Sequence, residues 1–279
     1  MLCLAPRAPG DSVRPRRLSD VVVRPLNFTV RRRTRRAMTE TFSNVYDDAD
    51  RARAYADLEF PGTYYLAFRD VPVLLRNYVC GRRALDFGCG TGRSSRFLRD
   101  LGFDVIGVDV SEAMLDQARG RDPHGDYRLV VDGTLAGFGT GALDLILAAF
   151  TFDNIPTDQQ KTSALRELRR LLAPGGRLVV VVSSPAIYWH EWTSFSTRDY
   201  PANRSARDGD SVRIVMLDVP DRRPVVDIVC SDTHYRELFE AVGLRVVDVV
   251  RPLATGAESV QWVSETTVPP WTIYVLGAV

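Results

Sequence analysis

Histidine and cysteine are scarce in this sequence, with three and four residues among 279. The cysteines form no C-x-x-C pair, and no group of cysteine and histidine residues has the spacing of metal ligands. These absences argue against a metal centre and predict reduced thiols in a cytoplasmic protein. The four cysteines are Cys3, Cys80, Cys89 and Cys230.

Long apolar runs and a strong net charge are also missing. The longest apolar run, 145–150, is far shorter than the roughly 18 residues of a membrane-spanning helix. The net charge of +1 hides an asymmetry, because residues 1–37 contain ten Arg and two Asp and the remainder therefore carries −7. An acidic body argues against nucleic-acid binding, which needs clustered cations. We expect neither a membrane nor a nucleic-acid partner, and the oligomeric state is left open.

The arginine-rich segment 1–37 is interrupted by four prolines and holds no convincing helix or strand. Three interpretations stay open: a disordered tail that precedes a natural start at Met38, a basic arm for nucleic acid or membrane, and a targeting segment. The first is favoured because solvated charge runs are common. We predict a basic extension at 1–37, a helical cap at 38–83 and the main domain at 84–279.

Three glycines alternate in the segment DFGCGTG, which follows a short apolar run and precedes a helix-like spacing of apolar residues. Glycines allow a close approach of the backbone to a ligand, and a helix start offers free N–H groups. A dinucleotide-binding loop has the spacing G-x-G-x-x-G, whereas here Asp86 is followed by Gly88, Gly90 and Gly92. An acid at this point suits a ligand that carries a cation and would repel a pyrophosphate.

Alternating strands and helices are predicted downstream. Strands are expected at 103–109, 127–131, 143–149, 177–183, 244–250 and 271–276, and helices at 112–119, 159–172 and 233–242. Asp109 ends the second strand, where it can accept hydrogen bonds from both ribose hydroxyls. Because a nicotinamide-dependent enzyme would also place an acid here, Asp109 indicates a nucleoside without choosing the cofactor.

Two motifs resemble those of a known family. The pattern D-x-G-x-G-x-G at 86–92 resembles motif I of the class I S-adenosylmethionine-dependent methyltransferases, and LRRLLAPGGRLVVVV at 168–182 resembles motif III. The resemblance covers 84–183 well and 232–279 more loosely. It implies an α/β fold with a doubly wound, seven-stranded Rossmann-like sheet whose last strand is antiparallel.

The resemblance also implies which residues hold S-adenosylmethionine. The glycine loop would cradle the methionine and ribose, Val110 and Met114 would flank the adenine, and Asp132 before Gly133 would read its amino group. By the strand-end rule, Phe150 to Asn154 lie between cofactor and substrate. The predicted cofactor-binding residues are Asp86, Gly88, Cys89, Gly90, Gly92, Asp109, Val110, Met114, Asp132, Gly133, Phe150, Tyr65 and Arg69.

The cap predicted at 38–83 is rich in aromatic residues, with helices at 43–58 and 63–79 and a kink or break at Pro72. Tyr64 and Tyr65 are candidates to line a pocket, because helices before motif I cover the cofactor in this family. Arg69 has two interpretations. It binds the α-carboxylate of the cofactor, or it forms a surface ion pair with Asp70 or Glu59.

Segment 184–231 predicts an inserted antiparallel hairpin, with strands at 212–219 and 225–230, that would act as a substrate lid. A hydroxyl or carbon acceptor needs a base, for which His190 is the candidate and Glu191 or Asp153 the alternatives, whereas a neutral amine needs none. Aromatic walls would attract a sulfonium. The predicted wall and substrate residues are Tyr64, Tyr65, Phe150, Phe152, Asn154, Trp189 and Trp192.

The sequence therefore predicts S-adenosylmethionine-dependent methylation of a small molecule, with an apolar or aromatic metabolite favoured, by in-line transfer to O, N or C. Three alternatives stay open: a nicotinamide-dependent oxidoreductase, a nucleic-acid methyltransferase that uses the Arg-rich tail, and a non-catalytic scaffold. The second lacks an N-P-P-Y-type tetrad, because TFDNIP follows the fourth main strand.

Overall fold

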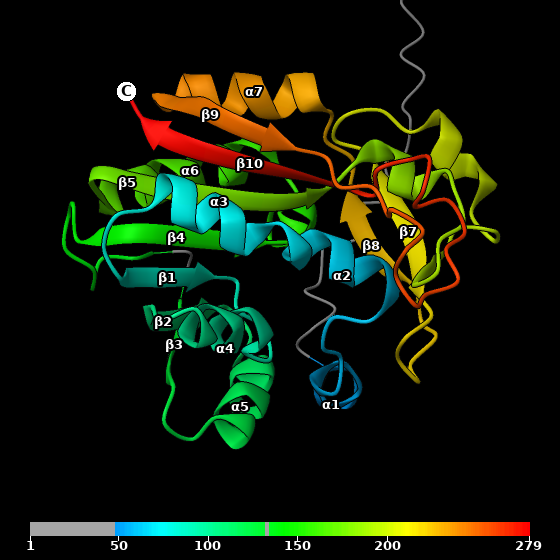
Figure 1. Ribbon diagram of the computed structural model, residues 1–279, viewed down its shortest axis with the longest axis horizontal. Helices are drawn as coiled ribbons and strands as arrows, with labels where there is room; N and C mark the ends of the chain where they lie inside the picture. The colour runs from blue at the N-terminus through cyan, green and yellow to red at the C-terminus, as the bar shows by residue number, and fades with distance from the viewer. Residues whose placement is uncertain (1–47, 132–133) are drawn as a thin grey trace, which may run out of the picture. The chain divides into compact units, whose positions relative to one another are not determined.

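The computed structural model describes residues 48–131 and 134–279. Its main sheet has seven strands in the order β3-β2-β1-β4-β5-β10-β9 (Figure 1). Strands β1 to β5 pair in parallel, whereas β10 runs antiparallel to both β5 and β9. The strands are β1 (Arg83–Phe87), β2 (Asp104–Asp109), β3 (Asp126–Leu129), β4 (Leu143–Ala149), β5 (Leu172–Ser183), β9 (Leu244–Val250) and β10 (Trp271–Ala278). The predicted doubly wound sheet with an antiparallel last strand is confirmed.

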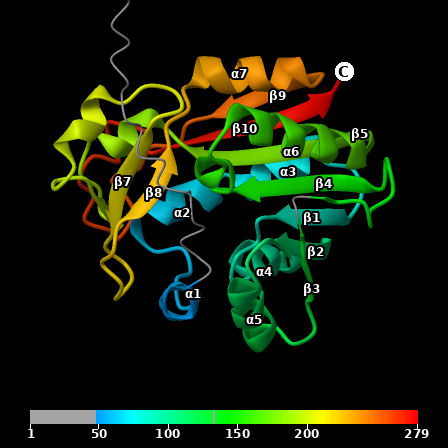
Figure 2. The same cartoon turned by 180° about the vertical axis from the view of Figure 1, so that it is seen from behind.

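Helices cover both faces of this sheet (Figures 1 and 2). One apolar cluster joins α2, α3 and α4 to the strands, and a second joins α6 and α7 to the opposite face. Ala84 belongs to the first cluster and its neighbour Leu85 to the second, as expected of a parallel strand buried on both sides. The helices are α1 (Ala49–Ala56), α2 (Gly62–Arg69), α3 (Val71–Tyr78), α4 (Arg93–Asp100), α5 (Glu112–Arg121), α6 (Asp158–Leu171) and α7 (Asp232–Ala241).

The cap contains three short helices where the sequence predicts two. The second predicted helix breaks between Arg69 and Val71, which places Pro72 in the first turn of α3. Proline is tolerated there because the first N–H groups of a helix have no intrahelical partner. The first predicted helix, 43–58, is described only from residue 48, and α1 begins at Ala49.

The P-G-G turn lies within a strand and does not precede it. β5 begins at Leu172, and its register with β4 shifts from Leu143↔Leu172 to Leu145↔Arg177, so residues 173–176 form a bulge. A Cβ on Gly176 would lie 2.8 Å from the Leu143 carbonyl oxygen. Glycine at this position therefore permits a close approach of two backbones.

The lid is a three-stranded antiparallel sheet in which β6 (Phe195–Ser196) adds a strand to the predicted hairpin. The hairpin consists of β7 (Ser211–Met216) and β8 (Val225–Ile228), and both strands end earlier than predicted. Short 3₁₀ turns, η3 (Pro185–Tyr188) and η4 (Pro201–Ser205), precede it. The lid packs on the same apolar cluster as α2 and α3. No helix in the described ranges is long and apolar enough to cross a membrane.

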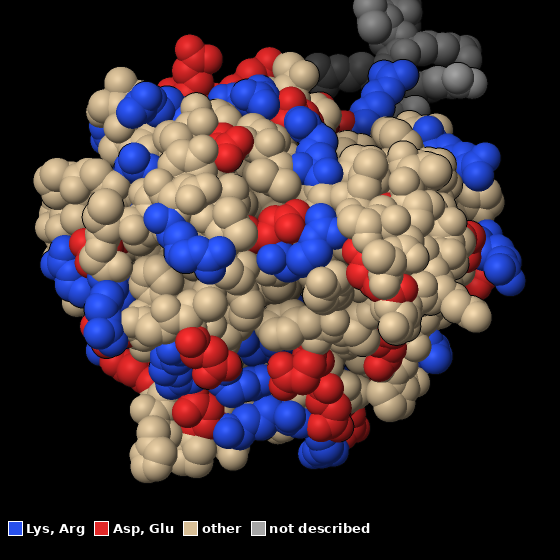
Figure 3. Space-filling model, in the orientation of Figure 1, with Lys and Arg blue, Asp and Glu red and all other residues tan. Residues whose placement is uncertain are grey.

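Charged side chains of both signs are mixed on the face shown in Figure 3. Over α1, α4 and α5 they form ion pairs, among them Arg96 with Glu59 and Arg119 with Glu112. This face therefore presents no large patch of one sign, which a phosphate backbone would require.

Candidate active site

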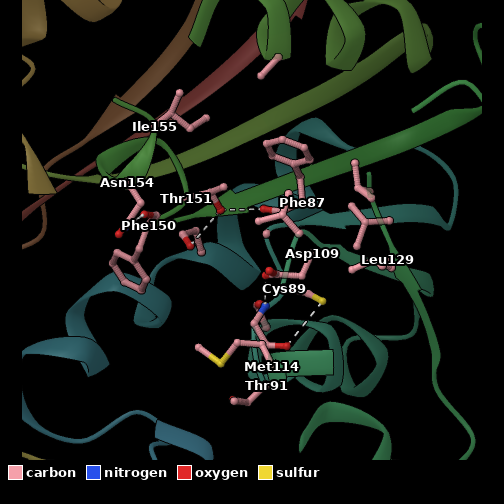
Figure 4. A pocket seen from close by; sticks show the side chains of 18 of the residues that line it. Phe87, Cys89, Thr91, Asp109, Met114, Leu129, Phe150, Thr151, Asn154 and Ile155 are labelled. Carbon is pink, nitrogen blue, oxygen red and sulfur yellow. Dashed lines mark hydrogen bonds between the residues drawn. The ribbon is translucent and has the colours of Figure 1, made fainter. Parts of the chain in front are cut away.

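A cavity of about 800 Å³ opens at the carboxyl ends of β1, β2 and β4. The glycine loop after β1 forms its floor, and segments after β2, β3 and β4 form its sides. Figure 4 shows Phe150 and Asn154 on one side of this cavity and Leu129 on the other, with Asp109 and Met114 between them. Ligands of open α/β sheets bind at these strand ends, so this cavity is the candidate site.

The glycine loop has a left-handed backbone at three positions. The φ angles of Gly88, Gly90 and Gly92 are +74°, +52° and +79°. A Cβ on Gly88 would lie 2.3 Å from the Thr151 hydroxyl, so only glycine fits beneath the loop after β4. A Cβ on Gly90 would meet only the Met114 methyl, at 3.9 Å, and would project into open space of the cavity. Gly90 thus leaves room for a ligand to approach the backbone.

Asp109 anchors this loop from the end of β2. Its Oδ2 accepts a 2.8 Å hydrogen bond from the Gly90 amide, and its Oδ1 accepts a 2.9 Å hydrogen bond from the Ser111 amide. The side chain lines the cavity together with Val110 and Met114. Carboxylate oxygens can accept more than one hydrogen bond, so Asp109 can hold the loop and also bind hydroxyls of a ligand.

Asp86 lies beneath the loop and does not line the cavity. Its Oδ2 accepts hydrogen bonds from the hydroxyls of Ser94 and Ser95, at 2.7 Å and 2.6 Å, which tie β1 to α4. Burial raises its pKa to about 6. Among the described residues no donor reaches its buried Oδ1. Asp86 therefore holds β1 and the start of α4 together and does not reach the cavity.

Arg93 is the cation of the cavity wall. It is 7% exposed, and its guanidinium carbon lies 4.9 to 5.8 Å from the ring centroids of Tyr55, Phe60, Tyr64 and Phe68. One of its nitrogens donates to the Glu59 carbonyl. The cation–π contacts and the hydrogen bond hold this guanidinium at the edge of the cavity.

Phe150 separates the large cavity from a smaller one. Its φ of +63° is the one positive value among the described non-glycine residues. Its ring packs 4.8 Å from the Trp271 ring and 5.8 Å from the Tyr64 ring, between centroids. The smaller cavity, of about 40 Å³, shares Tyr55, Phe150 and Asn154 with the larger one. A strained residue at a strand end between two cavities is typical of a functional position.

The described residues contain no group of three or more side chains that could hold a metal ion. The sequence predicts that no metal takes part in binding S-adenosylmethionine. Because that prediction covers the whole chain and not only the described residues, it stays a prediction.

Residues 85–180 match the family model described as a methyltransferase domain. A demethylmenaquinone methyltransferase of Renibacterium salmoninarum is 31% identical over 172 residues, which are 57% of this chain and 71% of the relative. The chain belongs to the class I S-adenosylmethionine-dependent methyltransferase family. As such it is an enzyme that uses S-adenosylmethionine as the methyl donor.

A second relative covers more of this methyltransferase. An N-demethylindolmycin N-methyltransferase of Streptomyces griseus is 28% identical over 210 residues, which are 74% of this chain and 87% of the relative. Among solved structures, DesVI of Streptomyces venezuelae has a TM-score of 0.57 at 19% identity and the CcbJ methyltransferase of Streptomyces caelestis one of 0.56 at 20% identity. Each structure covers 81% of this chain, which covers 98% of DesVI and 95% of CcbJ. These structural matches show the shared fold.

The residues present fit S-adenosylmethionine. Asp109 offers carboxylate oxygens at the end of β2, Gly90 leaves a free space above the loop, and Val110 and Met114 offer apolar surface beside them. Arg93 adds a cation for a carboxylate. When bound, the cofactor supplies a methyl group that its sulfonium has already activated for displacement.

Eight of the predicted site residues do not line either cavity of this methyltransferase. Phe152 and Trp192 belong to the core, Tyr65 is 39% exposed, and Arg69 pairs with Asp70 and Glu258. His190 is exposed on the lid, so its placement gives no support for a catalytic base there. The complete set outside the two linings is Asp86, Gly92, Tyr65, Arg69, Phe152, Trp189, His190 and Trp192.

Seven predicted cofactor residues do line the large cavity: Gly88, Cys89, Gly90, Asp109, Val110, Met114 and Phe150. The predicted substrate residues Tyr64 and Asn154 line the smaller cavity. The prediction for Asp132 and Gly133 falls outside the described residues. Glu191, the first alternative base, accepts hydrogen bonds from Ser196 and Thr197 within the lid. Asp153, the second, is buried beside the smaller cavity.

Sequence reasoning missed Arg93 and Asp227. Arg93 directly follows the glycine loop and is the first residue of α4. A basic residue at this position could have been recognised from the sequence as a candidate for the site. Asp227 is a charged residue among the apolar ones of a predicted strand, VVDIVC, and that interruption was the signal for it.

Proposed function

We propose that this methyltransferase acts on a small molecule with an apolar or aromatic body by in-line transfer of the methyl group. The observation that carries the proposal is the small cavity beyond Phe150, which shares Phe150 and Asn154 with the large cavity and is also lined by Tyr64 and Trp271. The reacting atom of an acceptor, placed in the 40 Å³ of the small cavity, would meet a donor in the large cavity at Phe150 and Asn154. Alignment of this kind contributes about 7–11 kcal/mol to a reaction barrier.

Each residue of the large cavity receives a proposed role. Asp109 accepts hydrogen bonds from the ribose hydroxyls, while Val110 and Met114 pack against the adenine. The Gly90 backbone lies against the methionine part of the cofactor. Arg93, in place of the predicted Arg69, binds the α-carboxylate, because Arg93 lines the cavity and Arg69 is paired elsewhere.

The relatives support a small-molecule acceptor. Their names refer to demethylmenaquinone and N-demethylindolmycin, both small molecules. The buried walls of the small cavity agree with such a class, since Ile187, Phe195 and Trp271 are all apolar and less than 6% exposed. The mixed charges on the face shown in Figure 3 support the prediction that nucleic acid is not the partner.

Ligand-induced thermal stabilisation tests the cofactor site. S-adenosylmethionine and S-adenosylhomocysteine at 100 times their Kd should stabilise the protein by about 2.7 kcal/mol, and NAD and NADP should not. Asp109→Ala should weaken both adenosyl ligands at least tenfold, because one charged hydrogen-bonding group is worth about 1.5–3 kcal/mol. Asp126→Ala is the matched control, because it removes a carboxylate from the amino end of β3, whereas the cavity lies at the carboxyl ends of the strands. Equal loss in both variants would contradict the role of Asp109.

A further inference from the structure

The lid presents one charged residue on an otherwise apolar inner face. In the β7–β8 pair, Asp227 stands opposite Val212, and Val225 stands opposite Ile214. Because alternate residues of a strand share a face, the same face carries Val212, Ile214, Met216, Val225 and Asp227. All five are less than 9% exposed. A carboxylate on such a face pays a desolvation cost unless a partner compensates for it.

Asp227 has only one partner within the part of the chain that the structure describes. The Tyr188 hydroxyl donates to its Oδ2 at 3.1 Å, and no described donor reaches its Oδ1. The side chain is 8% exposed and lines the small cavity. Asp227 therefore brings to the cavity a carboxylate oxygen that accepts no hydrogen bond from any described residue.

The charges around this oxygen favour a cation. Asp153, on the turn Phe152–Asn154, lines the same cavity, and its carboxylate accepts from the Ser183 amide at 3.0 Å. Lys161, on α6, is the nearby buried cation and donates to the Phe152 carbonyl. Two carboxyl groups thus lie near one ammonium, and when both are ionised their net negative charge would repel a phenolate or carbanion and attract a positive charge.

We propose that the small cavity takes the nitrogen of a basic amine whose apolar or aromatic body lies outside its 40 Å³, and that Asp227 binds this nitrogen and removes its proton. This inference rests on the proposed function and names its acceptor class. The ammonium proton passes to Asp227 Oδ1. The nitrogen lone pair then forms a bond to the methyl carbon while the carbon–sulfur bond breaks and its electrons stay on sulfur. The N-methylated product leaves as an ammonium ion.

The surroundings of Asp227 suit this proton transfer. Burial and the Asp153 charge raise the pKa of Asp227 to about 8. A proton acceptor works best when its pKa lies near the working pH. The other titratable groups around this site are Asp153 on the 3₁₀ turn, Lys161 on α6, Tyr188 on η3, Tyr235 on α7, and Tyr55 and Tyr64 of the cap. Burial raises the pKa of Tyr188 and Tyr235, which therefore stay neutral. Asp227 holds a proton below about pH 8 in the free protein, and an arriving ammonium favours its ionised form, which then takes the proton.

Binding of matched small probes tests the inference. We would titrate benzylamine and 2-phenylethylamine, with benzyl alcohol and 2-phenylethanol as their neutral counterparts, into the protein saturated with S-adenosylhomocysteine. The amines should bind at least tenfold more tightly than the alcohols. Asp227→Asn keeps the shape and an acceptor for Tyr188, so it should fold and should remove the preference without changing alcohol binding. Asp218→Asn, which removes the same charge from an exposed lid position, should leave the preference intact.

Three outcomes would overturn the inference: equal binding of amines and alcohols, no binding of either kind, or a preference that survives in Asp227→Asn. The comparison within the wild-type protein needs no variant, so a misfolded variant would not prevent the test. Affinity for S-adenosylhomocysteine is measured first in every protein. Failure of that ligand to bind wild type would overturn the proposed function, whereas its binding without an amine preference overturns only the acceptor class.

Discussion

At the scale of single residues, Gly90 and Gly102 separate two roles of glycine. Both have a left-handed backbone, with φ of +52° and +91°. A Cβ on Gly90 would enter the cofactor cavity, while a Cβ on Gly102, in the turn after α4, would meet no atom within 4 Å. A residue with a Cβ would therefore strain the backbone at both positions, but only at Gly90 would the Cβ also occupy space that a ligand could fill.

We expect Gly90→Ala and Gly102→Ala each to lower the free energy of unfolding by about 1–2 kcal/mol, the cost of a left-handed conformation for a residue with a Cβ. Only Gly90→Ala should also weaken S-adenosylhomocysteine, by about tenfold or more, since its methyl group occupies ligand space. Urea unfolding and titration calorimetry measure the two effects. Unchanged ligand affinity in Gly90→Ala would show that the cofactor does not approach this part of the loop.

At the scale of elements, one buried carboxylate joins the cap, the lid and the loop before β10. Glu265 is fully buried. Its Oε1 accepts from the Thr63 hydroxyl of α2 at 2.6 Å and from the Thr193 amide of the lid at 2.8 Å. Its Oε2 accepts from the amides of Val263 and Ser264. The cap and the lid are thus fixed to each other by one buried carboxylate.

Glu265→Ala should lower the free energy of unfolding by about 3–5 kcal/mol, because four donors lose their acceptor and one of them, the Thr63 hydroxyl, is fully buried. Glu265→Gln should cost less, since its amide oxygen still accepts hydrogen bonds. Glu240→Ala, at an exposed position of α7, should stay within about 0.5 kcal/mol of wild type. Urea unfolding at neutral pH compares the three. A cost for Glu265→Ala as small as that of the control would mean that this carboxylate does not hold the elements together.

At the scale of the whole molecule, the buried acids determine how stability depends on pH. Burial raises the pKa of Asp86 and Asp153 to about 6 and, with the Asp153 charge, that of Asp227 to about 8. Hydrogen bonding to Asp158 also raises the pKa of His234. The folded protein therefore binds more protons than the unfolded chain between the unfolded carboxyl pKa, about 4, and about 8.

Because the folded state holds the extra protons, the free energy of unfolding of the cofactor-free protein should fall as the pH rises from 5 to 8.5. Acids with lowered pKa values, such as Asp144 and Asp221, do not alter this window, since they are ionised in both states above about pH 5. Asp227→Asn should flatten the curve between pH 6 and 8 in urea-unfolding series. Stability that rises over this range would contradict the assignment of the raised pKa values.

Much of the fold was predictable because its signals are local. The apolar runs of β4 and β9 match the predicted strands 143–149 and 244–250, and the caps Ser111 and Ser231 hold the starts of α5 and α7. The sequence did not predict the early start of β5, where pairing with β4 extends the strand. It also did not predict β6, a third strand that pairs with the hairpin. Such pairings depend on residues that are distant in the sequence.

The sequence by itself determined the family, the succession of the main strands along the chain and the glycine loop, because glycine spacing and an acid at a strand end act within a few residues of each other. Only the tertiary structure decided which side chains of the cap and lid meet the site. Arg93 faces the cavity and Arg69 does not, because α2 turns Arg69 towards Asp70 and Glu258. Asp227 lines the small cavity because β8 pairs with β7 in a register that faces it inward. Register and burial across distant segments are properties of the packed chain.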